Sequence, residues 1–385
     1  MPRIAPDLPP PPRYPASVST PHARVSAPGS LANALAALPR PPAGARVCVV
    51  LPDATRPLDP ALALPPVLDW LGAPPAAVLI GLGLHRAPTP AERARVPFAD
   101  AQPHDPDDTA PLPDAPWPGG PPIPGGVARP VAAADLTLSL GVLEVHQYAG
   151  LSGGHKGVAV GCGARATIAA LHARARVLHP GVRLGALAGN PFRAAIDALG
   201  AAARCRIALG LLPDGRWLGG DPAALLPAAL PLLAPFVPTD RTYAAAVLRV
   251  PPAKASSVYQ ASRAATYLGL SPAPPLPAGA PLYVEAACPE GLGAEAGFVR
   301  ALASCPPPWS ALLDGPEPTG PGAQRAVILA LLARRHPLVF CAVDDPAPLR
   351  AVGLTATRAP APRGPDVLVV DAPFHRIPQA ASAPA

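Results

Sequence analysis

The hydrophobic and polar positions of the chain form short apolar runs that end in polar clusters, and this pattern predicts a sheet of parallel strands. Three runs share this design: ARVCVVLPDATRP (45–57), AAVLIGLGLHRAPT (76–89) and AADLTLSLGVLEVH (133–146). Helical stretches at 61–72 and 90–96 lie between them. Buried strands that alternate with helices are typical of a parallel α/β sheet, in which ligands bind beyond the carboxyl ends of the strands.

A second set of strand-like runs follows in the C-terminal half of the chain. These runs lie within residues 240–250, 281–293, 337–346 and 365–373. We therefore predict an α/β fold made of two α/β domains, with the active site in the interdomain cleft.

Four segments make up the predicted domain organisation. Residues 1–30 are rich in proline and lack periodicity, which indicates an extended arm or a disordered tail. An N-terminal α/β domain is expected over 31–247 and a C-terminal α/β domain over 250–359. The C-terminal tail, 360–385, is a candidate to pack back on the N-terminal domain.

Composition and charge narrow the function classes. The chain has 385 residues and a formal net charge of +6, but its arginines are spread out and do not interleave with aromatic residues as in a nucleic-acid-binding face. Residues 1–19 contain no signal-peptide apolar core, and the run 76–84 is about half a membrane span. The six cysteines form no CxxC pair, which favours buried thiols in a reducing compartment. We expect a cytoplasmic protein that binds neither nucleic acid nor membrane.

The glycine-rich stretch GLSGGHKG (150–157) contains one of two lysines in a chain with 29 arginines. Glycine leaves backbone N–H groups open to an anion, which an ammonium can neutralise. A P-loop is excluded, because the pattern requires glycine at 155 and a hydroxyl at 157, where the chain has His155 and Gly157. The stretch 161–166 fits a dinucleotide-binding GxGxxA pattern, but it lacks a preceding strand and a following acidic residue.

Three histidines are expected near this loop. His85 follows the second predicted strand, His146 ends the third, and His172 lies on the predicted helix ARATIAALHARARVL (164–178). Two neutral imidazoles can act as acid and base on opposite faces of a substrate, and a third can ligate nickel, copper or zinc. A structural role for each histidine, and an ordinary turn for the loop, are the alternatives.

Several motifs taken together resemble the nickel-dependent lactate racemase family. They are PDATRP (52–57), GLHRAPTPAE (83–92), the segment 144–172, VYQASRAATYL (258–268) and the segment 285–302. Members of that family use a nickel-pincer nucleotide, pyridinium-3,5-bisthiocarboxylic acid mononucleotide. Its nickel is held by two sulfurs, a ring carbon and one protein histidine. The resemblance implies a lactate-racemase-like cofactor-binding domain at 31–247.

The resemblance also assigns roles to individual residues. His85 and His146 match the catalytic acid/base pair, and His172 matches the nickel ligand. Lys156 matches the lysine that joins the cofactor through a thioamide, so a covalent link is open to this chain. Further cofactor-binding positions are Ser152, Gly153, Gly154, Asp53 and Arg56. The substrate-binding positions are Arg56, Tyr259, Gln260 and Arg263.

Two departures from the family pattern bear on the substrate and the loop. Arg263 stands where lactate racemase has a lysine for the substrate carboxylate, and this change of reach and shape argues against lactate itself. His155 stands where arginine is usual. Purely structural roles are the alternatives at the other positions. Asp53 and Arg56 could cap a turn, and Tyr259, Gln260 and Arg263 could lie on an ordinary helix face.

The expected activity is racemisation or epimerisation of a small 2-hydroxy carboxylic acid by reversible hydride transfer to the nickel-pincer nucleotide. Enzymes that make this cofactor are the expected partners. One alternative is an epimerase of a larger sugar acid or an aromatic hydroxy acid. The other is a non-catalytic paralogue that binds an organic acid or the nucleotide.

Overall fold

Two compact units make up the chain in a computed structural model, which describes residues 25–233, 235–239, 241–271, 274–305, 307–371 and 377–380. Unit 1 holds the described residues up to Leu143, together with Ser152–Ala170 and Ala194–Ala229. Unit 2 holds Glu144–Leu151, Leu171–Arg193 and the described residues from Leu230 onward. The first 24 residues of the predicted arm and the end of the predicted tail lie outside the described residues.

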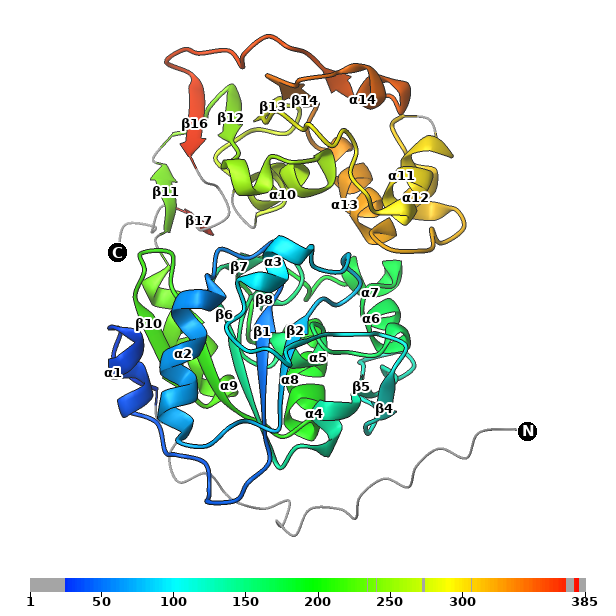
Figure 1. Cartoon of the computed structure of the whole chain (residues 1–385). Helices are drawn as coiled ribbons and strands as arrows, with labels where there is room; N and C mark the ends of the chain where they lie inside the picture. The colour runs from blue at the N-terminus through cyan, green and yellow to red at the C-terminus, as the bar shows by residue number, and fades with distance from the viewer. Residues whose placement is uncertain are drawn as a thin grey trace, which may run out of the picture. The chain divides into compact units, whose positions relative to one another are not determined.

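Unit 1 is built on a six-stranded sheet whose central strands are the three predicted apolar runs (Figure 1). Its order is β10-β9-β6-β1-β2-β3, and only the β10–β9 pair is antiparallel within it. The strands are β1 (Val47–Pro52), β2 (Ala77–Gly81), β3 (Gln102–Pro103), β6 (Leu136–Val142), β9 (Cys205–Leu211) and β10 (Trp217–Gly220). The predicted parallel α/β sheet is thereby confirmed.

Helices cover both faces of this sheet because side chains of β1 alternate between them. Val49 and Leu51 join a core with α1 (Leu31–Ala36) and α2 (Pro60–Leu71). Cys48 and Val50 join a second core with α4 (Arg129–Ala133) and α5 (Lys156–Ala159). The other elements that lie wholly within unit 1 are α3 (Pro90–Ala94), α9 (Pro222–Ala229), β4 (Thr109–Pro111) and β5 (Gly126–Ala128).

Two further helices, α6 (Arg165–Leu171) and α8 (Pro191–Ala202), have their residues divided between the two units. At the N-terminal edge, Val25 and Gly29 form antiparallel bridges to Gly220 and Trp217 of β10. The described end of the predicted arm therefore runs along the edge of the sheet.

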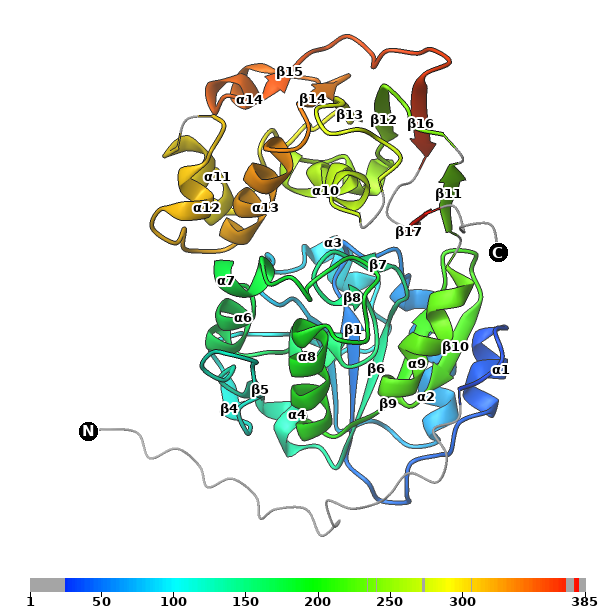
Figure 2. The ribbon, with the colours of Figure 1, turned by 180° about the vertical axis from the view of Figure 1, so that it is seen from behind.

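Unit 2 contains a five-stranded parallel sheet, and the C-terminal apolar runs supply all of its strands except β15 (Figure 2). Its order is β15-β14-β13-β12-β16, with β12 (Ala245–Arg249), β13 (Leu282–Glu285), β14 (Leu338–Cys341), β15 (Thr355–Ala356) and β16 (Val367–Asp371). The helices after these strands are α10 (Val258–Gly269), α11 (Ala296–Ala303), α12 (Ala311–Asp314), α13 (Ala323–Ala333) and α14 (Ala347–Ala351). Both halves of the chain are thus α/β, as the sequence predicted.

Shorter elements complete unit 2. They are β7 (Val145–His146), β8 (Gly150–Leu151), α7 (Arg174–Val177), β11 (Pro235–Thr239), β17 (Ile377–Ala380) and the 3-10 turns at Leu230–Leu232 and Pro252–Lys254. β7 pairs with β8 in antiparallel fashion, and β11 pairs with β17 in parallel.

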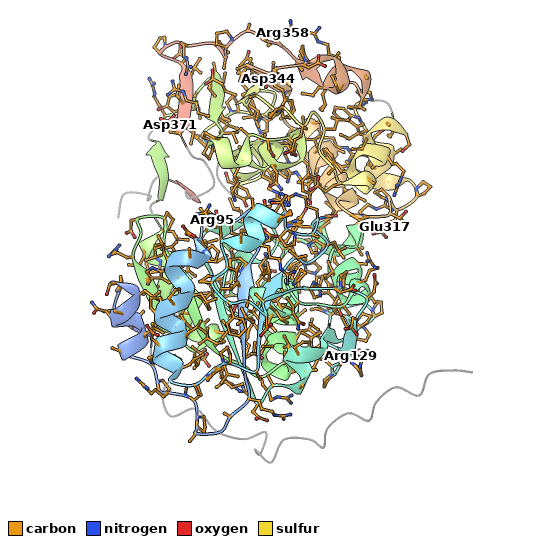
Figure 3. The ribbon with its side chains drawn as sticks, viewed as in Figure 1. Arg95, Arg129, Glu317, Asp344, Arg358 and Asp371 are labelled. Atoms are coloured by element: carbon orange, nitrogen blue, oxygen red, sulfur yellow. The ribbon has the colours of Figure 1, made fainter. Side chains whose placement is uncertain are left out.

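Many of the arginines form exposed ion pairs. Arg95 pairs with Asp59 and Arg129 with Asp108, each at 2.7 Å, and both arginines are labelled in Figure 3. Exposed pairs of this kind contribute about 0–1 kcal/mol to stability. The buried arginines near the candidate site are a different class, because each has lost its water and must be satisfied by the protein.

All six cysteines are free and buried, as expected from their spacing. Among the described residues, no helix combines the length and the apolar character needed to cross a membrane.

Candidate functional site

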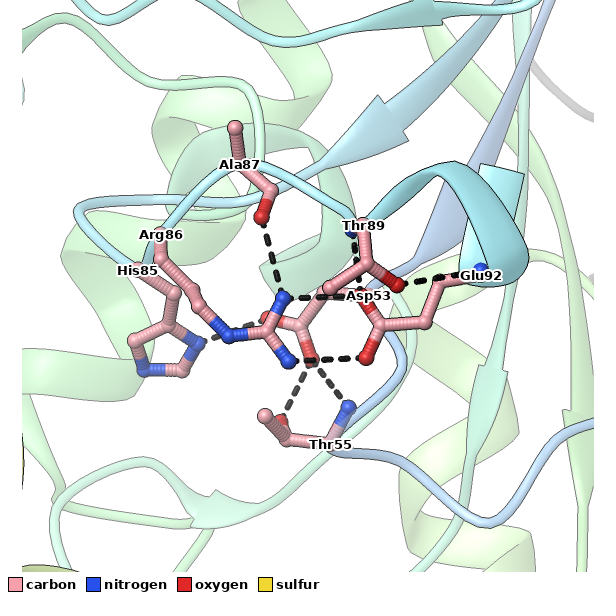
Figure 4. Close-up of polar contacts among 7 residues, drawn as sticks. All are labelled: Asp53, Thr55, His85, Arg86, Ala87, Thr89 and Glu92. Carbon is pink, nitrogen blue, oxygen red and sulfur yellow. Dashed lines mark hydrogen bonds and ion pairs between the residues drawn. The ribbon is translucent and has the colours of Figure 1, made fainter.

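The carboxyl ends of β1 and β2 bring Asp53 and His85 together. The last residues of these neighbouring parallel strands, Pro52 and Gly81, are paired in register, so the residues that follow emerge at the same edge. His85 Nδ1 lies 2.7 Å from Asp53 Oδ2 (Figure 4). The other carboxylate oxygen, Oδ1, accepts hydrogen bonds from the Thr55 backbone N–H at 2.9 Å and from the Thr55 hydroxyl at 2.5 Å.

Electrostatics keep the Asp53 carboxylate ionised. Burial alone would raise its pKa, but the hydrogen bond and charge of His85 and the charge of Arg56 together hold the pKa well below its ordinary value. The ionised carboxylate accepts the Nδ1–H of His85 whether or not the ring is protonated. When the ring is neutral, this bond leaves the Nε2 lone pair to accept a proton. The His85 side chain is 24% exposed, so it lies within reach of a ligand.

The segment after His85 is fixed by a capping box at the start of α3 (Figure 4). The Thr89 hydroxyl accepts from the Glu92 backbone N–H at 3.2 Å, and the Glu92 carboxylate accepts from the Thr89 N–H at 2.7 Å. Arg86 donates to both Glu92 oxygens at 2.7 Å, and this pairing lowers the pKa of Glu92 to about 2. The turn that carries His85 is therefore tied to the first turn of a helix.

The glycine-rich stretch leads directly into α5, which begins at Lys156. Gly153 and Gly154 adopt φ of 91° and 58°, a conformation that favours glycine. His155 is buried, and its Nδ1 lies 3.0 Å from Asp197 Oδ1 on α8. The family arginine is therefore replaced here by a buried imidazole that anchors the loop to α8, while Lys156 stays partly exposed.

The predicted cofactor position Ser152 carries a polar group that the described residues leave unsatisfied. Its hydroxyl oxygen is buried and has no hydrogen-bond partner within the described part of the chain. A buried hydroxyl normally has a partner, so this one is suited to a polar ligand atom. With the partly exposed ammonium of Lys156 in the same loop, the residues fit an anionic nucleotide.

His146 has the opposite proton arrangement from His85. Its Nδ1 accepts hydrogen bonds from the backbone N–H groups of Tyr148 at 3.2 Å and Ala149 at 3.1 Å. The lone pair at Nδ1 is thereby used, so the neutral ring carries its proton on Nε2. His146 is arranged as a hydrogen-bond donor, whereas His85 is arranged as an acceptor.

Two aromatic neighbours hold the predicted nickel ligand His172. Its ring packs edge-on against Tyr148, with centroids 5.8 Å apart, and against Phe192 at 5.5 Å. Tyr148 also packs edge-on against His146 at 5.7 Å, so one phenol ring contacts both histidines. The position of His172 differs from the prediction, because α6 ends at Leu171 and α7 starts at Arg174. The expected continuous helix 164–178 is therefore wrong, and His172 lies in the break.

Sequence reasoning missed two residues that hold the segment with His146 and Tyr148. Asn190 Nδ2 donates to the Tyr148 carbonyl at 2.8 Å, and its Oδ1 caps α8 by accepting from the Phe192 N–H at 3.0 Å. Buried Arg193 donates to the carbonyls of Ala149 at 3.1 Å and Leu151 at 2.9 Å. The Asn190–Pro191 pair, a cap residue before a first-turn proline, was the available signal.

The second-half candidates lie on α10, which Ser257 caps by accepting from the Gln260 N–H. Tyr259 is 4% exposed and packs edge-on against Phe298 at 5.5 Å. The Arg263 guanidinium carbon lies 5.1 Å from the centroid of the Tyr259 ring. Tyr259 therefore presents its ring to a cation, and Gln260 stays partly exposed at the start of the helix.

Two buried cations in unit 2 were also missed. Arg325, on α13, is 1% exposed and donates to Ser262 Oγ at 3.0 Å and to Gln147 Oε1 at 2.5 Å. Lys254 Nζ lies 3.4 Å from Glu144 Oε1. Both contacts reach the segment 144–151, from positions more than one hundred residues away. Burial lowers the pKa of Arg325 to about 10, against the opposing effect of Tyr148.

The described residues of unit 1 thus hold Asp53, Arg56, His85 and the loop with Ser152 and Lys156. Those of unit 2 hold His146, His172, Tyr259, Gln260 and Arg263. In unit 1, His85 contacts Asp53, and Ser152 and Lys156 share one loop. In unit 2, His146 and His172 both contact Tyr148, and Arg263 contacts Tyr259. No group of three or more histidine, cysteine or acidic side chains suited to a metal occurs within the described ranges, and a single-histidine ligand does not require one.

Comparisons with known proteins agree with the motifs before residue 185 and with the fold. Residues 33–185 match the family model of the lactate racemase N-terminal domain. The lactate racemase apoprotein from Thermoanaerobacterium thermosaccharolyticum has a similar structure, with a TM-score of 0.75, 18% identity and coverage of 91% of this chain and 92% of that one. A protein from Thermotoga maritima has a TM-score of 0.69, 15% identity and coverage of 90% and 95%. No curated protein matches the chain.

These matches rest on different levels of evidence. The structural likeness supports the fold over most of the chain, whereas the family match concerns the part that carries Asp53, His85, His146, Lys156 and His172. The resemblance to the lactate racemase family is thereby confirmed, and it is carried by residues 33–185, which match the model of the lactate racemase N-terminal domain.

Proposed function

We propose that the chain is a racemase or epimerase of a 2-hydroxy carboxylic acid. The observation that carries the proposal is the Asp53–His85 pair, with its 2.7 Å contact. It supplies a base of fixed orientation at the carboxyl ends of two parallel strands, where α/β folds bind ligands. The pair lies within residues 33–185, which match the model of the lactate racemase N-terminal domain.

The opposite proton arrangements of His85 and His146 support an acid/base pair. Interconversion of a 2-hydroxy and a 2-oxo acid requires removal of the hydroxyl proton and its return at the same oxygen. His85 would remove the proton through Nε2, since Asp53 holds the Nδ1–H. His146 would donate a hydrogen bond from Nε2–H to the substrate oxygen, since two backbone N–H groups occupy its Nδ1.

The nickel-pincer nucleotide is the proposed cofactor. When bound, it supplies a hydride acceptor and donor for the substrate α-carbon. Ser152, Gly153, Gly154 and Lys156 would hold it, because they combine an unsatisfied buried hydroxyl with a glycine loop and an ammonium. His172 would ligate the nickel, since a neutral imidazole is a good nickel ligand.

Two arginines are the proposed carboxylate partners, Arg56 of the first motif and Arg263 of α10. A guanidinium can bind a carboxylate through two parallel hydrogen bonds, which orients the substrate as well as neutralising it. Tyr259 and Gln260 would complete the substrate contacts.

The test is expression of the chain together with the cofactor-making enzymes. Nickel analysis, intact mass and chiral chromatography of a panel of 2-hydroxy acids would be measured on the same preparation. We expect about one nickel per chain and loss of optical purity for at least one acid. An added mass that disappears in Lys156→Ala would show a covalent link.

A variant separates metal binding from folding. His172→Ala should lose nickel while its circular dichroism spectrum stays unchanged. Full nickel content in this variant would contradict the ligand assignment. Nickel with no racemisation of any acid would instead favour the non-catalytic paralogue.

A further inference from the structure

Tyr148 carries a buried hydroxyl that the described residues leave without a hydrogen-bond partner. The residue is 3% exposed, and its oxygen is closed off from solvent. A buried donor without a partner lowers the free energy of unfolding, whereas the phenylalanine of the same shape would not. An unsatisfied group at a candidate site therefore points to a ligand that completes it.

Backbone hydrogen bonds and ring packing both hold Tyr148 in place. Its N–H donates to His146 Nδ1 at 3.2 Å, and its carbonyl accepts from Asn190 at 2.8 Å. Its ring packs against His146, His172 and Phe192 with centroids 5.7–5.8 Å apart. The phenol that carries the hydroxyl is thus packed against the rings of two candidate site histidines.

Two guanidinium groups act on this hydroxyl without a matching carboxylate. Burial raises the pKa of Tyr148 above its ordinary value, and the charges of Arg325 and Arg263 oppose that shift. The described partners of Arg325 are the neutral groups of Ser262, Thr266 and Gln147. Within the part of the chain that the structure describes, neither arginine has a carboxylate at ion-pair distance. Two guanidinium groups without a carboxylate partner, together with the unsatisfied Tyr148 hydroxyl, favour the binding of an anion.

We propose that the Tyr148 hydroxyl donates a hydrogen bond to the substrate carboxylate beside Arg263, and that it selects carboxylates over neutral 2-hydroxy compounds. Arg325 supplies charge without direct contact, because its N–H groups already bind α10 and Gln147. The substrate class rests on the proposed function, whereas the role of the hydroxyl rests on its own geometry.

The variant Tyr148→Phe tests this proposal through two opposite effects. Removal of the unsatisfied hydroxyl should raise the melting temperature of the ligand-free protein. The same change should weaken carboxylate binding by about 10-fold, as expected for loss of a hydrogen bond to a charged group. A purely structural tyrosine would not produce both effects together.

Calorimetric titration of the purified, nickel-free full chain with sodium lactate, malate and mandelate gives the affinities. Mandelamide serves as the neutral probe, and Tyr148→Phe should narrow the preference for mandelate over mandelamide. Tyr283→Phe is the matched control, because Tyr283 is a half-buried tyrosine on β13 of the same unit. It should change neither affinity nor selectivity.

The outcomes separate this proposal from the proposed function. Equal carboxylate affinity in Tyr148→Phe and the unchanged chain would overturn it, and so would the absence of saturable carboxylate binding to the unchanged chain. Carboxylate binding that depends on Tyr148, in a protein that racemises none of the acids, would support it and contradict the racemase assignment alone.

Discussion

Asp53 acts on His85 by fixing which ring nitrogen carries the proton. In Asp53→Asn the amide N–H can donate to Nδ1. The neutral His85 ring would then carry its proton on Nε2, so no Nε2 lone pair would be left to accept the substrate proton. We expect kcat to fall by about 100-fold or more while the fold persists, measured by chiral chromatography and circular dichroism. Asp214→Asn is the control, since it loses an exposed pair with Arg216 and should keep full activity. Wild-type turnover in Asp53→Asn would remove Asp53 from the mechanism.

The same carboxylate gives a pH dependence of stability. Because the folded pKa of Asp53 is depressed, its contribution is fully present above the unfolded value of about 3.9 and is lost as the pH falls through the folded value. The difference in unfolding free energy between the wild type and Asp53→Asn should therefore be constant from about pH 7 to pH 5 and shrink below about pH 4. Urea unfolding at several pH values measures it, and a difference that grows on acidification would contradict the assigned sign.

His85 and His146 should both be needed in each direction of a racemisation. Substitution of either by glutamine should lower kcat/KM by about 100-fold or more. Since two enantiomers are equally stable, the loss must be the same starting from either one. Initial rates from the separate enantiomers measure this, and an unaltered rate in one variant would exclude that histidine.

At the scale of elements, Gly150 at the start of β8 leaves no room for a side chain. Gly150 has a φ of 72°, and a Cβ there would lie 2.1 Å from the Ala186 carbonyl oxygen. We expect Gly150→Ala to lower the unfolding free energy by about 3 kcal/mol or more through strain and overpacking. Gly44→Ala is the control, because its φ is 76° but nothing lies within 4 Å, so only about 1 kcal/mol of backbone strain remains. Equal losses in urea unfolding would contradict the packing argument.

The elements that the sequence predicted well are those with strong local patterns. Apolar runs with polar ends predicted β1, β2, β6 and the strands β12, β13, β14 and β16 of the second sheet, because burial on both faces leaves a readable run. The two-residue strand β15 lies outside these runs and was not predicted. The helix 164–178 was wrong for a nonlocal reason. The Arg174 N–H donates to Glu317, and its guanidinium donates to the Gly315 carbonyl at 2.7 Å. Partners more than 140 residues away replace the helical bonds, and no local periodicity reports them.

The sequence identified only part of the candidate site. Its histidines and Lys156 were recognisable by their residue type and by the motifs that contain them. The roles of Tyr148, Asn190 and Arg193 depend on which atoms they meet, since they act through an unsatisfied hydroxyl and through backbone carbonyls. Residue type alone does not carry that information.

At the scale of the whole chain, the compact units do not follow the order of the sequence. Unit 2 takes in Glu144–Leu151 and Leu171–Arg193 besides the residues from Leu230 onward. A fragment of residues 230–385 would therefore lose Glu144, the partner of buried Lys254, and Gln147, the partner of Arg325. Loss of one member of a buried ion pair typically costs about 3–5 kcal/mol.

We expect this fragment not to fold cooperatively by itself, as judged by its thermal unfolding. Addition of residues 25–229 in trans should restore part of the cooperativity. A fragment that melts alone with the stability of the full chain would contradict the importance of the two inserted segments.

Because the chain has only two lysines, an amine-reactive reagent can be directed to one of them. Lys254 is 7% exposed and paired with Glu144, whereas Lys156 is partly exposed at the start of α5. Apart from the terminal amino group, an acylating reagent used in limiting amount on the folded protein should therefore react at Lys156. A fluorescent or spin label could thus be installed in the glycine loop of the native sequence, without first replacing any other residue.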